Sequence, residues 1–243
     1  MTGGTAGIGL ATAEALAALG WRVAIGARRE ERLAAAVEAV EKAGGRGFGH
    51  TLDVADADSI DAFVAAAEQA LGPVDVLVNN AGSATPGPLH ELPVEAIRAA
   101  VESSLLGSLL VTRRVLQSLL ARGEGGDVVF VSSRAAALAW PQNAPYGAAK
   151  AGVENAAGAL RVELEGTGVR VTLVRVGDTV TEFGATWTPK EFAHVSGWFQ
   201  RGLVKGAVLK AADVAAAVVA GVTAPRGVAL ETLVVNPEPP RQA

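Results

Sequence analysis

The sequence alternates short apolar runs with longer alanine-rich stretches, and this alternation constrains the fold more than any other feature. The runs are rich in β-branched residues, which is typical of parallel strands covered on both faces. They lie at 22–25, 47–52, 74–78, 127–131, 169–174 and 229–235. Helical patterns occur near 8–19, 29–43, 57–71, 93–121, 145–166 and 211–223. This order predicts repeated βαβ units, and therefore an α/β fold with a doubly wound parallel sheet and helices on both faces.

The chain has 243 residues, which suits one domain spanning 1–243. One stretch, 181–206, falls outside the alternation and contains Phe183, Trp187, Phe192 and Trp198. We interpret it as a lid over a substrate site. A helical hairpin that buries its own aromatic side chains is the alternative.

Composition excludes several classes of function. The net charge is −4, whereas nucleic-acid binders are usually basic. There is no cysteine, and the three histidines have no metal-binding spacing, so we expect no metal. No apolar run approaches the ~18 residues that span a bilayer, and no signal peptide precedes the first motif. We therefore expect a cytoplasmic protein that binds neither nucleic acid nor membrane.

A glycine-rich turn opens the chain. Gly3, Gly7, Ile8 and Gly9 lie directly before or within the start of the first helical pattern, with Thr5 among them. Such a turn lets the backbone approach a pyrophosphate, which then lies at the positive end of the helix. It predicts a Rossmann-type dinucleotide site. The alternative is a plain strand–helix turn.

A dinucleotide fold requires a central strand before this turn, but only Met1 precedes Thr2. Without that strand, two rows of buried backbone groups lose their partners, each at a cost of about 1–3 kcal/mol. We expect either about ten further N-terminal residues in the natural protein or another segment in the gap.

Four more segments follow in order. Asp53-Val54 follows the third expected strand, Asn79-Asn80-Ala81-Gly82 follows the fourth, and Ser133 ends the fifth. Tyr146 and Lys150 then open the next helix in the pattern YxxxK. Together with the glycine-rich turn, these segments resemble the short-chain dehydrogenase/reductase (SDR) family over nearly the whole chain.

The residues also indicate a chemistry directly. Tyr146 and Lys150 are four positions apart and share one helix face. A nearby cation lowers the pKa of a phenol, so the pair could move a proton to or from an alcohol or carbonyl oxygen. Ser133 offers a hydroxyl to the same oxygen. The resemblance implies the same roles: Tyr146 as general acid/base, Lys150 on the nicotinamide ribose, and Ser133 polarising the carbonyl. An interfacial tyrosine is the alternative.

The expected cofactor is NADP(H) rather than NAD(H). NAD-selective sites usually place an acid at the end of the second strand, where this chain has Ala27 followed by Arg28 and Arg29. Guanidinium groups suit a 2′-phosphate, although a solvated charged helix start is the alternative. The expected cofactor-binding residues are Gly3, Thr5, Gly7, Ile8, Gly9, Arg28, Arg29, Asp53, Val54, Asn79, Ala81, Gly82, Tyr146, Lys150, Gly177, Thr179 and Thr181.

Two positions depart from the family pattern. Ser104 occupies the place of an asparagine that supports a proton relay, so this relay could differ or be absent. Val176-Gly177 replaces the common Pro-Gly, while Thr181 still matches the threonine that usually meets the nicotinamide carboxamide.

We therefore expect an oxidoreductase that transfers hydride between NADP(H) and a small carbonyl or secondary alcohol. The expected substrate pocket contains Trp140, Phe183 and Trp187, which suit an apolar or aromatic substrate. The resemblance implies a homodimer or homotetramer. The alternatives are a non-catalytic NADP(H)-binding sensor or scaffold, or a related enzyme without net redox change.

Overall fold

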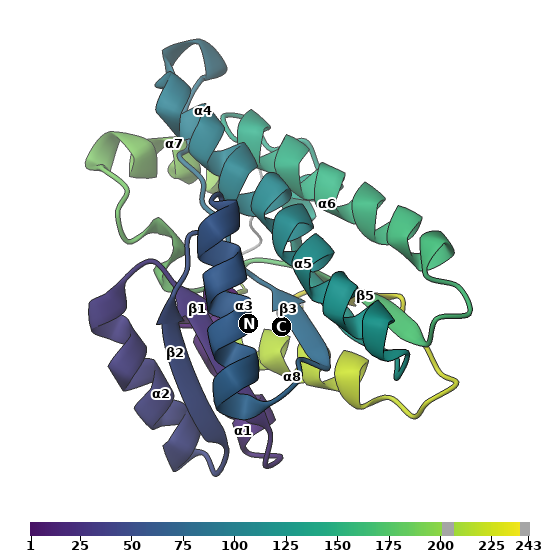
Figure 1. Cartoon of the computed structure of the whole chain (residues 1–243). Coiled ribbons are helices and arrows are strands. Elements are labelled where there is room, and N and C mark those ends of the chain that lie inside the picture. Colours follow the sequence, from purple (N-terminus) through teal and green to yellow (C-terminus); the bar gives the residue numbers. More distant parts are fainter. Residues whose placement is uncertain (201–206, 239–243) are drawn as a thin grey trace.

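Two sets of parallel strands form the centre of the protein in the computed structural model, which describes residues 1–200 and 207–238 (Figure 1). The first set pairs β1 (Arg22–Ala27) with β2 (Arg46–Thr51). The second has the order β3 (Val76–Asn79), β4 (Gly126–Ser133), β5 (Val169–Val176) and β8 (Thr232–Val235). Every pairing in both sets is parallel, as crossover helices require.

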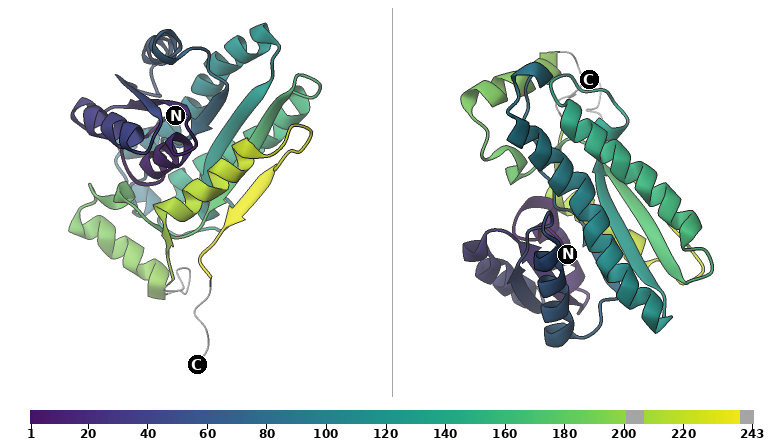
Figure 2. Two further views of the ribbon diagram at one scale, coloured as in Figure 1. Left: turned by 90° about the horizontal axis from the view of Figure 1, so that it is seen from below. Right: turned by 45° about the horizontal axis from the view of Figure 1, so that its top comes forward.

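Helices cover both faces of the strands, which confirms the doubly wound arrangement (Figure 2). One face carries α3 (Ala57–Leu71), α5 (Gly107–Arg122) and α6 (Ala144–Glu163), and the other carries α1 (Gly7–Ala17), α2 (Leu33–Lys42) and α8 (Ala211–Thr223). In β4, Val128 and Phe130 pack into the core of the first face, whereas Val129 and Val131 pack into the core of the second. This strand is apolar throughout because both of its faces are buried.

A gap separates the two sets of strands, between β1 and β3. Met1 and Thr2 bridge its carboxyl end: the Gly26 N–H donates to the Met1 carbonyl at 2.9 Å, and the Thr2 N–H donates to the Val78 carbonyl at 3.1 Å. Below them lies a cavity of about 480 Å³ between β1 and β3. A segment of two residues therefore fills only one end of the gap.

The long helix expected at 93–121 is interrupted. It consists of α4 (Val94–Val101), a π-helical turn at Glu102–Leu106, and α5. A π turn inserts one extra residue into the helix, which no periodicity in the sequence indicated. The helix expected at 29–43 also begins later, because a 3₁₀ turn at Glu30–Arg32 precedes α2.

The segment expected as a lid contains a 3₁₀ turn at Glu182–Gly184 and the helix α7 (Pro189–Gln200). Its two ends meet where β6 (Thr179–Val180) pairs with β7 (Leu209–Lys210). The Lys190 ammonium donates to Glu91 at 2.9 Å, which ties α7 to the body of the protein. Residues 201–206 of the expected lid lie outside the described residues.

Candidate active site

A cavity of about 800 Å³ lies at the carboxyl ends of β1, β3, β4 and β5. This is the end of an open parallel sheet at which ligands bind in α/β folds. The cavity extends from the glycine-rich turn to the lid segment, and its volume is within the range of ligand sites, about 300–1,000 Å³.

The glycine-rich turn forms a narrow cradle on one side of this cavity. Gly3 and Gly7 have φ angles of +64° and +53°, a region that side chains other than glycine rarely adopt. A methyl group on Gly9 would overlap the Gly3 carbonyl oxygen. The Asn80 side chain donates from Nδ2 to that same oxygen at 3.0 Å, which fixes the turn against β3. This open backbone at the start of α1 fits the pyrophosphate of a dinucleotide.

Charged side chains lie at the far end of the same cleft, after β1. Arg28 and Arg29 line the cavity and are exposed. Asp53 also lines it, and its Oδ1 accepts a hydrogen bond from the Ala55 N–H at 3.0 Å, which shapes the turn before α3. Both guanidinium groups are therefore available to an anion such as a nucleotide phosphate.

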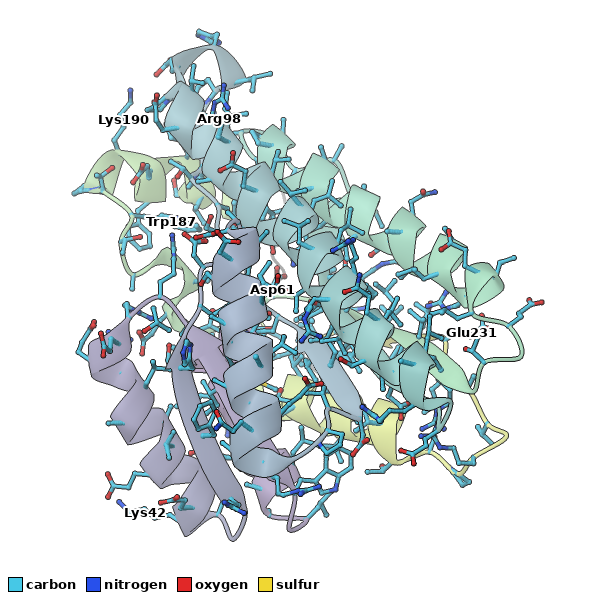
Figure 3. The ribbon with its side chains drawn as sticks, viewed as in Figure 1. Lys42, Asp61, Arg98, Trp187, Lys190 and Glu231 are labelled. Atoms are coloured by element: carbon cyan, nitrogen blue, oxygen red, sulfur yellow. The ribbon has the colours of Figure 1, made fainter. Side chains whose placement is uncertain are left out.

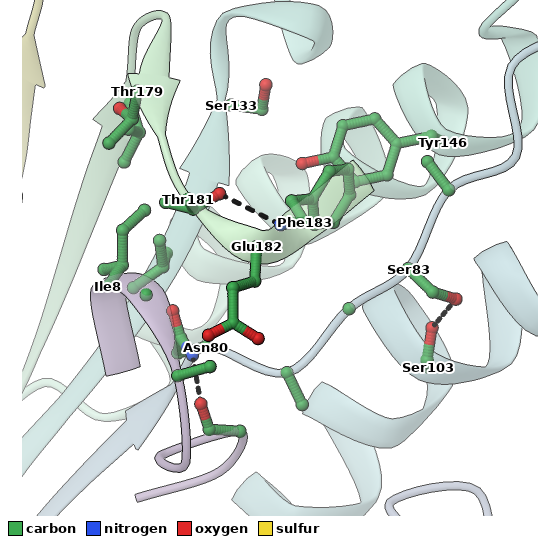
Figure 4. A pocket seen from close by; sticks show the side chains of 18 of the residues that line it. Ile8, Asn80, Ser83, Ser103, Ser133, Tyr146, Thr179, Thr181, Glu182 and Phe183 are labelled. Carbon is green, nitrogen blue, oxygen red and sulfur yellow. Dashed lines mark hydrogen bonds between the residues drawn. The ribbon is translucent and has the colours of Figure 1, made fainter. Parts of the chain in front are cut away.

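Ser133, Tyr146 and Lys150 meet at the other end of the cradle. Ser133 is the last residue of β4, and Tyr146 and Lys150 lie in the first turns of α6. The phenol oxygen of Tyr146 points into the pocket, on the side of Ser133 and Thr181 (Figure 4). The Lys150 ammonium is 5.8 Å from the centroid of the Tyr146 ring and donates to the Val131 carbonyl at 2.7 Å. The sequence spacing therefore does bring these groups to one cavity.

Burial dominates the ionisation of this pair. It raises the pKa of Tyr146 to about 12, although the Ser133 hydroxyl acts in the opposite direction. It also lowers the pKa of the Lys150 ammonium to about 8. The expected net lowering of the tyrosine pKa is therefore wrong, because the cost of burying a phenolate exceeds the benefit of the Ser133 hydrogen bond.

Ser104 lies in the π-helical turn, next to this group of residues. Its side chain is fully buried, and among the described residues its hydroxyl has no hydrogen-bond partner. A methyl group built on Gly82 would come within 2.9 Å of the Ser104 oxygen and 3.7 Å of the Lys150 nitrogen. The hydroxyl, Gly82 and the ammonium therefore converge on one spot at the edge of the cavity, which Gly82 and Lys150 line.

Aromatic side chains form the wall nearest the lid. Trp140, Phe183 and Trp187 all line the cavity, and the ring of Phe183 lies 5.4 Å from that of Tyr146. Trp187 lies between α7 and the body of the protein (Figure 3), where its indole N–H donates to the Ala84 carbonyl at 2.7 Å. This wall is apolar, and the indole N–H of Trp187 already has a partner in the protein's own backbone.

The structure places most of the expected site residues around the cavity, with three exceptions. Asn79, Ser104 and Gly9 do not line it. Asn79 points to the opposite side of β3, where its Nδ2 donates to Thr112 at 2.8 Å. Its neighbour Asn80 faces the cavity instead, because successive side chains of a strand alternate between faces.

Sequence reasoning missed other residues that line the cavity. Asn143 precedes α6, Glu182 follows Thr181, and Arg134 and Asp178 follow Ser133 and Gly177. Arg134 and Asp178 form an ion pair at 3.0 Å, and burial raises the pKa of Asp178 while Arg134 opposes this. Their positions directly after two expected site residues were the available signal.

Within residues 1–200 and 207–238, no group of three potential metal-ligating side chains occurs. None of the helices in these ranges is both long and apolar enough to cross a bilayer.

Comparison with known proteins gives matches over most of the chain. A family profile described as short chain dehydrogenase matches residues 1–191. A short chain dehydrogenase of Pseudocercospora fijiensis is 37% identical over 76% of this chain, which spans 60% of that relative's length. Sulfoacetaldehyde reductase 2 of Chromohalobacter salexigens is 37% identical, over 75% of this chain and 73% of the relative. The solved structure of a variant of actinorhodin polyketide ketoreductase with NADPH has a TM-score of 0.85 and 33% identity, covering 98% of this chain and 94% of that one.

Proposed function

The chain belongs to the short-chain dehydrogenase/reductase family, and from the geometry of its cleft we propose that it transfers hydride between NADP(H) and a carbonyl or alcohol substrate. The observation that carries this proposal is that Tyr146 and Lys150 lie at one end of a cavity whose other wall is the glycine-rich cradle. A proton donor and a dinucleotide site in one cleft are what carbonyl reduction requires.

The residues present fit NADP(H). The cradle formed by Gly3, Gly7 and Ile8 would hold the pyrophosphate, and Arg28 and Arg29 would bind a 2′-phosphate. Ala27, which ends β1, brings no carboxylate that would repel that phosphate. The NADPH bound to the structurally similar ketoreductase supports the same choice.

NADPH would supply the hydride, and the protein's own residues would manage the proton. Because its pKa is raised to about 12, the Tyr146 phenol is protonated at neutral pH and can donate to the carbonyl oxygen of the substrate. The buried Lys150 ammonium stabilises the phenolate that remains. Ser133 offers a hydroxyl to the same oxygen and holds it as negative charge develops.

Other features of the whole protein belong to the same proposal. We propose one SDR domain over 1–243, with 181–206 as the lid of the substrate site and Trp140, Phe183 and Trp187 as its walls. Assembly into a homodimer or homotetramer and a cytoplasmic location are expected from the family resemblance and the cysteine-free sequence.

The test is NADPH consumption with a panel of ketones and aldehydes, measured for the wild type and for Tyr146→Phe. Loss of a general acid costs about 10²–10⁴-fold in rate, so we expect turnover to fall by that factor while NADPH still binds. Unchanged turnover in Tyr146→Phe would contradict the mechanism. Tight NADPH binding without turnover on any carbonyl would instead support a sensor or scaffold, the alternative that the unpartnered Ser104 hydroxyl favours.

A further inference from the structure

One ion pair lies among the apolar walls of the substrate end of the cavity. The Arg134 guanidinium donates from Nη1 to Asp178 Oδ2 at 3.0 Å, and the two side chains are only 21% and 12% exposed. Both residues line the cavity that contains Ser133 and Tyr146. The pair therefore belongs to the surface that a substrate would contact.

The position of this pair follows from the strand register. Ser133 at the end of β4 is directly opposite Val176 at the end of β5. Arg134 is the next residue after Ser133, and Asp178 lies two residues after Val176. The two charges therefore meet across the carboxyl ends of adjacent strands, next to the hydroxyl expected to hold the reacting oxygen.

The surroundings of Arg134 are aromatic on one side. Its guanidinium carbon is 6.0 Å from the centroid of the Trp140 ring, which in turn packs edge-to-face with Trp198 at 4.8 Å. A cation over an indole face is attracted to it, and a poorly hydrated site strengthens each electrostatic interaction. This arrangement holds the guanidinium in a fixed place beside the cavity.

Asp178 uses little of the hydrogen-bonding capacity of Arg134. A guanidinium has five N–H donors, and within the described residues the recorded hydrogen bond from this one goes to a single carboxylate oxygen. Burying a charged pair in this way costs more desolvation free energy than it usually returns, so stability alone is a weak reason for it. The remaining donors suit the paired oxygens of a second acid.

We infer that Arg134 binds an acidic group of the substrate, and that the substrate is a short oxo acid or its hydroxy acid. This inference rests on the proposed function, because it places the carbonyl oxygen at Ser133 and Tyr146. Arg134 directly follows Ser133 and lines the same cavity, so the proposal places the carboxylate or sulfonate a few bonds from the reacting carbon. Asp178 acts as a positioning residue that holds one edge of the guanidinium.

The acidic group takes no part in the bond changes. In reduction, the carbonyl carbon gains hydride from NADPH, the oxygen gains the Tyr146 proton, and NADPH becomes NADP⁺. The carboxylate or sulfonate stays ionised on Arg134 throughout. The apolar or aromatic substrate expected from the wall residues is the rival, since Trp140, Phe183 and Trp187 would pack equally well against an uncharged molecule.

The test compares acetoacetate with its neutral methyl ester as substrates of the wild type and of Arg134→Gln. In the wild type, we expect kcat/KM for the acid to exceed that for the ester at least about tenfold. The difference should come from a lower KM for the acid, with similar kcat values. Arg134→Gln should reduce this ratio to near one. Arg134→Lys keeps the charge without the paired donors and should restore part of the ratio. The matched control is Arg46→Gln. Arg46 begins β2, at the end of the strand that points away from the cavity, so this change should leave the ratio unchanged.

A binding measurement separates the two proposals. Acetoacetate should quench the fluorescence of the cavity tryptophans in the NADP⁺-bound wild type. Arg134→Gln should raise the Kd for acetoacetate at least about tenfold, since the acid then loses its charged hydrogen-bond donor. Acid binding that depends on Arg134 without any turnover would support this inference and contradict the proposed function. Reduction of both compounds at a ratio that Arg134→Gln does not change would overturn this inference and leave the proposed function standing.

Discussion

The pKa of Lys150 predicts how carbonyl reduction depends on pH. Burial lowers this pKa to about 8, from an ordinary value of 10.5. The charged form, which stabilises the Tyr146 phenolate, is therefore lost as the pH rises through 8. Going from pH 7 to pH 9 reduces the protonated fraction about tenfold, so kcat/KM for reduction should fall by about the same factor.

The sign depends on which group titrates. The Tyr146 phenol remains protonated over this interval, because its pKa is about 12, so the fall cannot come from loss of the proton donor. In Lys150→Arg the guanidinium stays charged throughout this interval, so we expect lower activity but a flat profile between pH 7 and 9.

The measurement is the initial rate of NADPH consumption at low carbonyl concentration, from pH 6 to pH 10 in buffers of constant ionic strength. A wild-type profile that stays level through pH 9 would refute this reasoning. An equal fall in Lys150→Arg would also refute it, because some group other than Lys150 would then control the rate.

Three further substitutions test other parts of the structure. Arg28→Asp should reverse the preference for NADPH over NADH, and equal kcat/KM ratios before and after the change would contradict a phosphate site there. Gly9→Ala places a methyl group on a backbone carbonyl of the cradle and should raise the Kd for NADPH at least about tenfold by titration. In its control, Gly158→Ala, the new methyl group would lie in open space on α6. We expect this change to raise the stability of the helix by up to about 1 kcal/mol. Asp127→Ala leaves Arg170 buried without its carboxylate and should lower the free energy of unfolding in urea by about 3 kcal/mol, and a loss below ~1 kcal/mol would contradict this.

The fold was largely predictable because its layers follow from local patterns. The apolar runs of β4 and β5 are buried on both faces, as their composition indicated. The π-helical turn at Glu102–Leu106 was not predictable, because it changes the helix by one residue and leaves the apolar spacing similar. The partial closure of the gap between β1 and β3 by Met1 and Thr2 was not predictable either, because it depends on hydrogen bonds to two strands far along the chain.

The candidate site also contains residues that the sequence identified and residues that it misplaced. The sequence pointed to Tyr146, Lys150 and Ser133, and the structure brings all three to one cavity. Asn79 was placed there wrongly, although the alternation of side chains along β3 already distinguished it from Asn80.

By itself, the sequence determined what depends on near neighbours: the strand–helix order, the glycine-rich turn, and the shared helix face of Tyr146 and Lys150. Only the tertiary structure decided which distant segments meet. It paired Arg134 with Asp178 across two strand ends, and it buried Lys150 and half-buried Tyr146, so that desolvation shifts both pKa values. The physical reason is that backbone propensity and periodicity act over a few residues, whereas burial and charge pairing depend on every segment packed around a group.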